Sequence, residues 1–280
     1  MEKSIFSDER YVETDELFSV PHGKILQFEE VINDLISPDS GEKLSFDKTL
    51  RQLHTNEYTY PIENGIPILY PYYLTKPFTG KGLEMDYYSD SRLQYFLLSQ
   101  IKQKGEINAP FTSIHYQRHL FRMKEFMKPF SGKVLDIGCD DVNIGASLCN
   151  DSCTYVGIDP FSSFNGDFKI VATGEFLPLK NESFDVVMFN TSLDHILDYH
   201  TGIDEAYRVL KPGGVLIVST IIWKERATLL SDAVHFHHFR EYEISGCLSE
   251  KGALVNDIRY NYKSDMHRYG LYIAYRKNKA

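Results

Sequence analysis

The sequence has few cysteines, no excess of positive charge and no long apolar run. Its 4 cysteines in 280 residues are unevenly spaced, which excludes a disulfide framework and a four-cysteine zinc site and is typical of reduced thiols. The net charge of -9 disfavours nucleic-acid binding through a basic surface. No segment has the length of apolar residues that a membrane span requires, and the acidic N-terminus lacks the apolar core of a signal peptide. We therefore expect a cytoplasmic protein.

A Gly-x-Gly-x-x-Gly loop, the fingerprint of nicotinamide-dinucleotide domains, is also absent. From Lys133 onward, short apolar runs alternate instead with helical patterns, which predicts a mostly parallel, doubly wound α/β sheet. The expected strands are 133–139, 154–160, 168–173, 184–190, 214–222, 254–262 and 269–277, and the expected helices are 204–214 and 240–253.

Three zones follow from these patterns. Residues 1–75 carry short apolar runs broken by Pro and Gly, which indicates a small β-rich module. Residues 76–130 hold helical patterns at 90–105 and 113–130 and are expected to form a helical lid or brace. Residues 131–280 form the α/β domain.

Two carboxylates stand where the first two strands of this domain end. Asp136 precedes Gly138, at which the chain must turn sharply. Asp159 ends the second strand, and a carboxylate there can accept hydrogen bonds from both hydroxyls of a ribose, although it could instead cap a helix. Ligands of doubly wound sheets bind at these strand ends, so both residues are candidates for a binding site.

Four segments in combination resemble the class I S-adenosylmethionine-dependent methyltransferases, above all the group of the quinone-biosynthesis methyltransferases. They are "VLDIGC" (134–139), "GIDP" (157–160), "GEFLPLKNESFDVVMFNTSLDHI" (174–196) and "EAYRVLKPGG" (205–214), and the match extends over residues 133–277. The resemblance implies a seven-stranded Rossmann-like sheet, S-adenosyl-L-methionine as cofactor, and methyl transfer to oxygen, nitrogen or carbon of a small or medium-sized acceptor.

The resemblance also implies roles for individual residues. Asp136 and Gly138 would flank the methionine end of the cofactor, and Asp159 would hold its ribose. The turn 173–175 would meet the adenine, and residues after the fourth strand would line the floor near the sulfonium. The candidate cofactor-binding residues are Asp136, Gly138, Cys139, Asp140, Asp159, Pro160, Thr173, Gly174, Glu175, Asn190, Thr191 and Leu193.

The loop after the first strand departs from the family pattern. Asp140, Asp141 and Val142 stand where the family usually has Gly-x-Gly. Side chains at these places are expected to clash or to push the loop outward, with Gly145 as a candidate for a displaced turn. A carboxylate there could instead face the sulfonium or ammonium of the cofactor. Thr173 stands where the family often has Asp.

The N-terminal zone resembles a small zinc-ribbon module that occurs beside methyltransferases or activates them. The resemblance rests on "YPIENGIPILYP" (60–71), while "SPDS" (37–40) and residues 53–56 stand where the ribbon carries cysteine pairs. Every zinc ligand is missing and serine is a poor substitute, so we expect no metal there. The fold would then depend on apolar packing by Ile62, Ile66, Ile68 and Leu69.

Candidates for acid–base chemistry follow the fourth and fifth strands. Asp194 and His195 come just after the fourth strand, and His195 could take a proton from the acceptor or simply pack over the cofactor. His238, in "HFHHF" (235–239), matches a family histidine and is the third catalytic candidate. Three histidines could suggest a metal site, but no carboxylate or cysteine lies at a usual spacing, so none is predicted.

Three functions remain open from the sequence. The first is an active methyltransferase with a small-molecule acceptor. The second is a catalytically inactive relative that serves as a binding or scaffold protein. The third, an RNA-modifying subunit, is suggested by the ribbon and opposed by the acidic charge. The sequence names neither the acceptor nor the oligomeric state.

Overall fold

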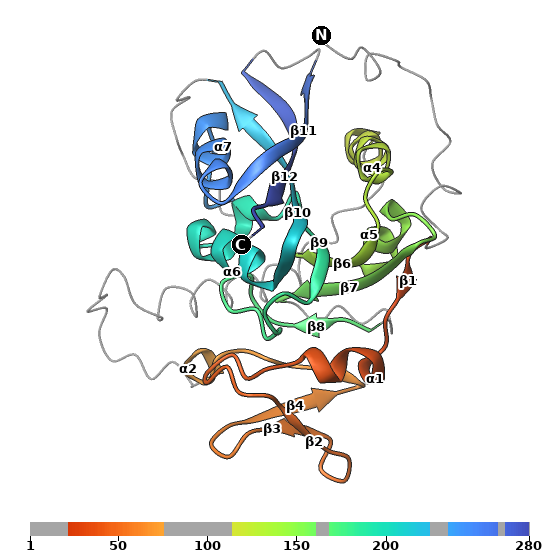
Figure 1. Ribbon diagram of the computed structural model, residues 1–280, viewed down its shortest axis with the longest axis vertical. Coiled ribbons are helices and arrows are strands. Elements are labelled where there is room, and N and C mark those ends of the chain that lie inside the picture. Colours follow the sequence, from red (N-terminus) through yellow and green to blue (C-terminus); the bar gives the residue numbers. More distant parts are fainter. Residues whose placement is uncertain (1–21, 76–113, 161–167, 225–234, 263–266, 280) are drawn as a thin grey trace, which may run out of the picture.

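The computed structural model describes residues 22–75, 114–160, 168–224, 235–262 and 267–279. Its main sheet has the strand order β1-β7-β6-β9-β10-β12-β11 (Figure 1). The parallel centre consists of β7 (Cys153–Asp159), β6 (Gly132–Ile137), β9 (Phe184–Asn190) and β10 (Leu210–Trp223), and the antiparallel end of β12 (Arg268–Lys277) and β11 (Gly252–Asn261). The predicted doubly wound α/β fold is confirmed.

Helices cover both faces of this sheet (Figure 1). On one face, α4 (Ile114–Met127) and α5 (Val142–Leu148) share a core with β6, β7 and β9. On the other face, α6 (Tyr199–Val209) and α7 (Glu241–Ser249) pack into a core that extends into the N-terminal module. The helix expected over 204–214 ends at Val209, and the Lys-Pro-Gly-Gly stretch instead opens β10 with a break in its register against β9.

The edge beside β7 is built from two separate pieces of chain. The first piece, β1 (Lys24–Ile25), pairs with the beginning of β7, and β8 (Ile170–Val171) pairs with its end. The described part of the main sheet therefore has 8 strands, one more than expected. The strand expected over 168–173 is only two residues long.

The N-terminal module is a separate antiparallel sheet of β2 (Ser45–Asp47), β3 (Gln52–His54), β4 (Thr59–Glu63) and β5 (Ile66–Pro67). Two short helices, α1 (Phe28–Val31) and α2 (Tyr72–Thr75), and a 3-10 turn, η2 (Ile32–Asp34), complete it. Ile62, Ile66 and Leu69 are buried as expected, whereas Ile68 is half-buried. The zinc-ribbon relationship and the three domain boundaries stay predictions.

Part of the predicted lid lies outside the described residues, namely the helix expected over 90–105. The other helix expected in this zone is α4, which begins at Ile114. Among the helices in the described ranges, none has the length and apolar character needed to cross a membrane.

Candidate active site

The loop after β6 forms a compact turn although it lacks two of the expected glycines. Gly138, with a φ of 79°, donates its N–H to the Ile158 carbonyl at 2.7 Å. Asp140 takes a left-handed φ of 50°, which aspartate tolerates better than most side chains. The Asp140 N–H then donates to Asp159 Oδ2 at 2.9 Å. Asp141 caps α5 by accepting the Asn143 N–H at 2.9 Å, which is the usual task of an N-cap carboxylate.

Two further glycines explain how this loop packs. Gly157 on β7 leaves the space that the Val142 and Cys139 side chains occupy, because a Cβ there would lie 2.8 Å from Val142 and 2.7 Å from Cys139. Gly145 lies inside α5 and does not form a displaced turn. A Cβ on it would lie 1.9 Å from the Tyr155 hydroxyl. The Val142 and Cys139 side chains are thus accommodated beside β7.

Asp136, at the end of β6, is a buried carboxylate with one oxygen in use. Its Oδ2 accepts the Tyr155 hydroxyl at 2.7 Å, while its Oδ1 is buried and has no hydrogen-bond partner. Burial raises the pKa of Asp136 to about 7, the Tyr155 hydrogen bond lowers it, and the nearby Asp159 charge raises it. An unpartnered buried oxygen is costly, so a cationic group of a ligand would stabilise Asp136 in its ionised form.

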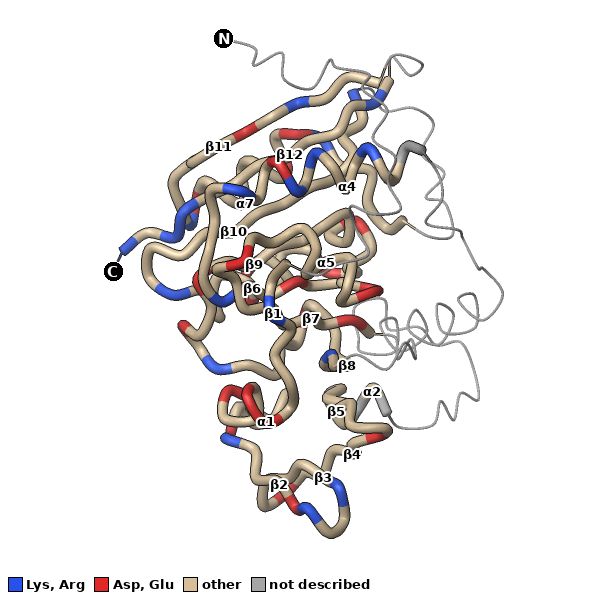
Figure 2. The backbone as a smooth tube through the Cα atoms, turned by 90° about the vertical axis from the view of Figure 1, so that its right-hand side faces the viewer, with Lys and Arg blue, Asp and Glu red and all other residues tan. Residues whose placement is uncertain are grey.

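Acidic groups surround this turn, and red segments lie near β7 and α5 in Figure 2. Burial raises the pKa of Tyr116 on α4, and the charges of Asp140, Asp136 and Asp141 raise it further. The ammonium of the buried Lys169 donates a hydrogen bond to the Asp140 carbonyl of the turn at 3.0 Å. Such a surrounding favours the sulfonium and ammonium of S-adenosylmethionine. The residues present therefore fit this cofactor.

The turn after β8 lies against the segment that follows β9. Gly174 packs so closely that a Cβ would lie 2.6 Å from the Ile196 side chain. The Glu175 carboxylate accepts the Leu197 N–H at 3.0 Å, and burial raises the pKa of Glu175. This carboxylate thus holds the backbone of residue 197 in place.

The floor after β9 is fixed by a histidine that sequence reasoning missed. Asn190 Oδ1 accepts hydrogen bonds from His119 Nε2 at 2.8 Å and from Ser219 Oγ at 3.0 Å. His119 Nδ1 lies 2.9 Å from the Tyr272 hydroxyl. Burial lowers the pKa of His119 to about 4, so its ring is neutral and donates only through Nε2. The available signal was its place one helical turn before Met123, on the buried face of α4.

The other residues after β9 are held by hydrogen bonds to backbone carbonyls or by burial in the core. Thr191 has a left-handed φ of 55° and donates its hydroxyl to the Asn190 carbonyl at 2.7 Å. Leu193 is fully buried in the main core. Ser192 donates its hydroxyl to the Ile137 carbonyl, and it leaves no room for a Cβ on Gly138. The loops after β6 and β9 are thereby locked together.

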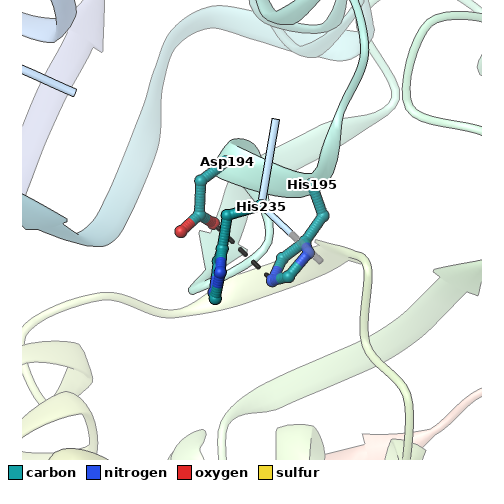
Figure 3. A group of neighbouring side chains, drawn as sticks. All are labelled: Asp194, His195 and His235. Carbon is teal, nitrogen blue, oxygen red and sulfur yellow. Dashed lines mark ion pairs between the residues drawn. The ribbon is translucent and has the colours of Figure 1, made fainter. Parts of the chain in front are cut away.

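Asp194 and His195 lie in a short 3-10 helix, η3 (Leu193–His195), and His235 joins them (Figure 3). The ligand atoms of the three side chains lie within 4.8 Å of one another, and the two imidazole centroids are 4.6 Å apart. The Phe236 and His237 N–H groups donate to the Asp194 carbonyl at 2.9 and 3.3 Å, which holds His235 in the group. His238 instead stacks on Trp223, with a centroid distance of 4.6 Å.

Burial and the neighbouring histidines act on the Asp194 carboxylate in opposite directions. The buried Asp194 Oδ1 makes no hydrogen bond and lies 4.0 Å from His195 Nε2. Burial raises the pKa of Asp194, whereas the facing His195 and His235 lower it. The His195 side chain is 34% exposed, so it can reach an acceptor. The spacing of the three groups would also admit a divalent cation.

Comparison with known proteins finds a protein family that matches part of this sequence. Residues 135–218 match the family described as "Methyltransferase domain". This match agrees with the resemblance to class I S-adenosylmethionine-dependent methyltransferases that the motifs indicate.

Particular relatives support this assignment. The ubiquinone biosynthesis O-methyltransferase of Chelativorans sp. is 29% identical over 116 residues, which are 37% of this chain and 46% of that protein. The ubiquinone/menaquinone biosynthesis C-methyltransferase UbiE of Geotalea daltonii is 28% identical over 148 residues, which are 47% of this chain and 63% of that protein. This chain thus spans less than two thirds of either relative.

Among solved structures, the 1,6-didemethyltoxoflavin-N1-methyltransferase of Burkholderia thailandensis has a TM-score of 0.51 and 14% identity, over 71% of this chain and 93% of that one. That structure holds 1,6-didemethyltoxoflavin and S-adenosylhomocysteine. At this identity the likeness supports the fold.

Proposed function

We propose that the protein transfers a methyl group from S-adenosylmethionine to a small or medium-sized acceptor. The observation that carries this proposal is the arrangement of two carboxylates at one turn. Asp136 Oδ1 is buried without a hydrogen-bond partner, and Asp159 accepts the Asp140 N–H of the turn that follows. These groups lie at the carboxyl ends of β6 and β7, where doubly wound sheets bind their ligands. We also propose a cytoplasmic location, because the four cysteines are free thiols.

Each end of the cofactor has residues of suitable chemistry. Asp136 would accept the ammonium of the methionine part, and Asp159 would accept the ribose hydroxyls. Thr173 and the backbone of the following turn would meet the adenine. When bound, S-adenosylmethionine supplies an electrophilic methyl group on a sulfonium. Asn190, fixed by His119 and Ser219, would keep the floor beside that methyl group in one position.

On the acceptor side, we propose His195 as the base. It would take the proton of the acceptor, and Asp194 and His235 would stabilise the resulting charge and hold the ring. The sequence made His238 the third catalytic candidate. His238 stacks on Trp223, however, whereas His235 lies beside Asp194 and His195. A base is needed when the acceptor is a hydroxyl, a protonated amine or a carbon acid.

Calorimetric titration with S-adenosylhomocysteine tests the cofactor assignment. The native protein is expected to bind in the micromolar range, and Asp159→Ala is expected to abolish binding because the ribose and the Asp140 N–H both lose their acceptor. Asp151→Ala is the matched control, since that carboxylate is 90% exposed. A flat titration with folded native protein would refute the proposal.

Turnover tests the acceptor side once an acceptor has been found by screening hydroxyl, amine and carbon-acid compounds. His195→Gln is expected to lower kcat by about 10² to 10⁴, the usual contribution of a general base, with unchanged affinity for S-adenosylhomocysteine. Loss of activity after dialysis against a chelator, restored by a divalent cation, would instead make Asp194, His195 and His235 a metal centre. Tight cofactor binding without turnover on any acceptor would favour the scaffold function.

A further inference from the structure

The N-terminal module meets the methyltransferase domain beside the expected nucleoside position. Ile68 forms a parallel bridge with Val171 of β8, and the Leu69 N–H donates to the Val171 carbonyl at 2.7 Å. The chain that follows Val171 runs directly into the turn 173–175. The end of the module therefore runs alongside the strand that leads to the expected adenine contact, and Figure 1 shows the module next to β8.

Tyr70 follows this bridge and reaches the other side of the expected nucleoside position. Its hydroxyl donates to the Pro160 carbonyl, one residue beyond Asp159. Burial raises the pKa of Tyr70, and the Asp159 charge raises it further. Because the hydroxyl is held by a backbone carbonyl, the orientation of the ring is fixed.

Apolar neighbours pack with the Tyr70 ring. The buried Leu74 of α2 packs with Tyr70, Phe176 and Leu197. Phe176 follows the turn 173–175, and Leu197 is the residue whose N–H the Glu175 carboxylate accepts. Tyr70 is thus enclosed between the end of β7 and the turn after β8, the two places that would hold ribose and adenine.

We propose that Tyr70 is part of the nucleoside-binding surface, so that the N-terminal module supplies one wall of the site for an adenine nucleoside. This inference rests on the proposed function, because the nucleoside is that of S-adenosylmethionine. An aromatic ring beside a base or sugar contributes by stacking and apolar contact. The module then has a binding role within the same chain, without any metal.

A hydrogen-bond network inside the module keeps Tyr70 in place. The Tyr60 hydroxyl donates to Asp39 Oδ2 at 2.6 Å and accepts from the buried Ser37 hydroxyl at 2.7 Å. The other end of the network is the Tyr72 N–H, which donates to Asp39 Oδ1 at 2.8 Å. Ser37 also accepts the Asp39 N–H at 3.2 Å. Asp39 is therefore a positioning residue for the segment that carries Tyr70.

The test is calorimetric binding of S-adenosylhomocysteine and of methylthioadenosine, which shares its nucleoside and lacks the amino acid. Tyr70→Ala is expected to weaken binding of both ligands about tenfold or more, in the range of a lost stacking contact. Tyr70→Phe keeps the ring and is expected to retain most of the affinity. Tyr242→Ala is the control, since that tyrosine is 70% exposed on α7.

Thermal unfolding of each variant accompanies the titrations. If Tyr70→Ala fails to fold, Tyr70→Leu keeps the packing on Leu74 without the aromatic ring and is expected to show the same loss for both ligands. Wild-type affinity in a folded Tyr70→Ala or Tyr70→Leu would overturn this inference alone. Absence of S-adenosylhomocysteine binding to the native protein would overturn the proposed function with it.

Discussion

Binding of S-adenosylhomocysteine should depend on pH through Asp136. The pKa of Asp136 is raised to about 7 by burial, and its Oδ1 has no partner in the described structure. A ligand ammonium placed there would bind the ionised carboxylate and not the protonated one. Affinity should therefore rise as pH rises through the pKa of Asp136, and binding below that pH should release a proton.

The size of the effect follows from the ionised fraction. With a pKa of about 7, roughly 9% of Asp136 is ionised at about pH 6 and roughly half at about pH 7. If only the ionised form binds, the apparent Kd should fall about fivefold over that single pH unit. The amino group of the ligand remains largely protonated over this interval, as expected for an α-amino group.

Calorimetry at these two pH values, in buffers of different ionisation enthalpy, measures both the Kd and the released proton. Methylthioadenosine lacks the ammonium and should bind equally at both pH values. Asp136→Asn should bind S-adenosylhomocysteine weakly and without pH dependence. A pH-independent Kd for the native protein, or the same dependence in Asp136→Asn, would refute the role of this carboxylate.

Three further predictions concern stability and are measured by urea denaturation. Gly145→Ala should lower the free energy of unfolding by about 1–3 kcal/mol through overpacking, because its Cβ would meet the Tyr155 hydroxyl. Gly246→Ala, the control with open space around its Cβ, should raise the free energy of unfolding by about 0.4–1 kcal/mol. Equal effects of the two substitutions would contradict this packing. Burial raises the folded-state pKa of Asp136 above its ordinary value. The contribution of Asp136 to the free energy of unfolding is therefore complete below about pH 4 and is lost as pH rises through about 7. Asp136→Asn should remove this pH dependence of stability. Asp140→Gly should change the free energy of unfolding by less than about 1 kcal/mol, since relief of the left-handed strain offsets the added chain freedom, and a larger loss would mean that the Asp140 side chain supports the turn.

The central strands could be predicted from the sequence because each is a short apolar run buried on both faces. The strands β6, β7 and β9 are largely buried along their length, so their hydrophobicity alone marks them. The loop after β6 could not be predicted in the same way. Val142 fits because Gly157 on the neighbouring strand has no side chain, and this partner is distant in sequence.

The candidate catalytic group shows a second limit of sequence reasoning. Asp194 and His195 are adjacent in sequence, so their joint placement after β9 was predictable. Which histidine of "HFHHF" joins them depends on two backbone hydrogen bonds to the Asp194 carbonyl, and a side-chain pattern does not encode these. The roles of these residues, like those of the cofactor-binding residues, stay predictions until the variants are measured.

The pairing of β1 with β7 has a consequence for how the chain folds. Lys24 and Ile25 cover the first half of the edge of β7, against Thr154 and Tyr155. Such a contact closes a very long loop, so it is expected to form late, after the local strand pairs. During synthesis the N-terminal segment would have to wait for β7 to emerge. Until then β7 would present an open strand edge, at which unfolded chains can associate.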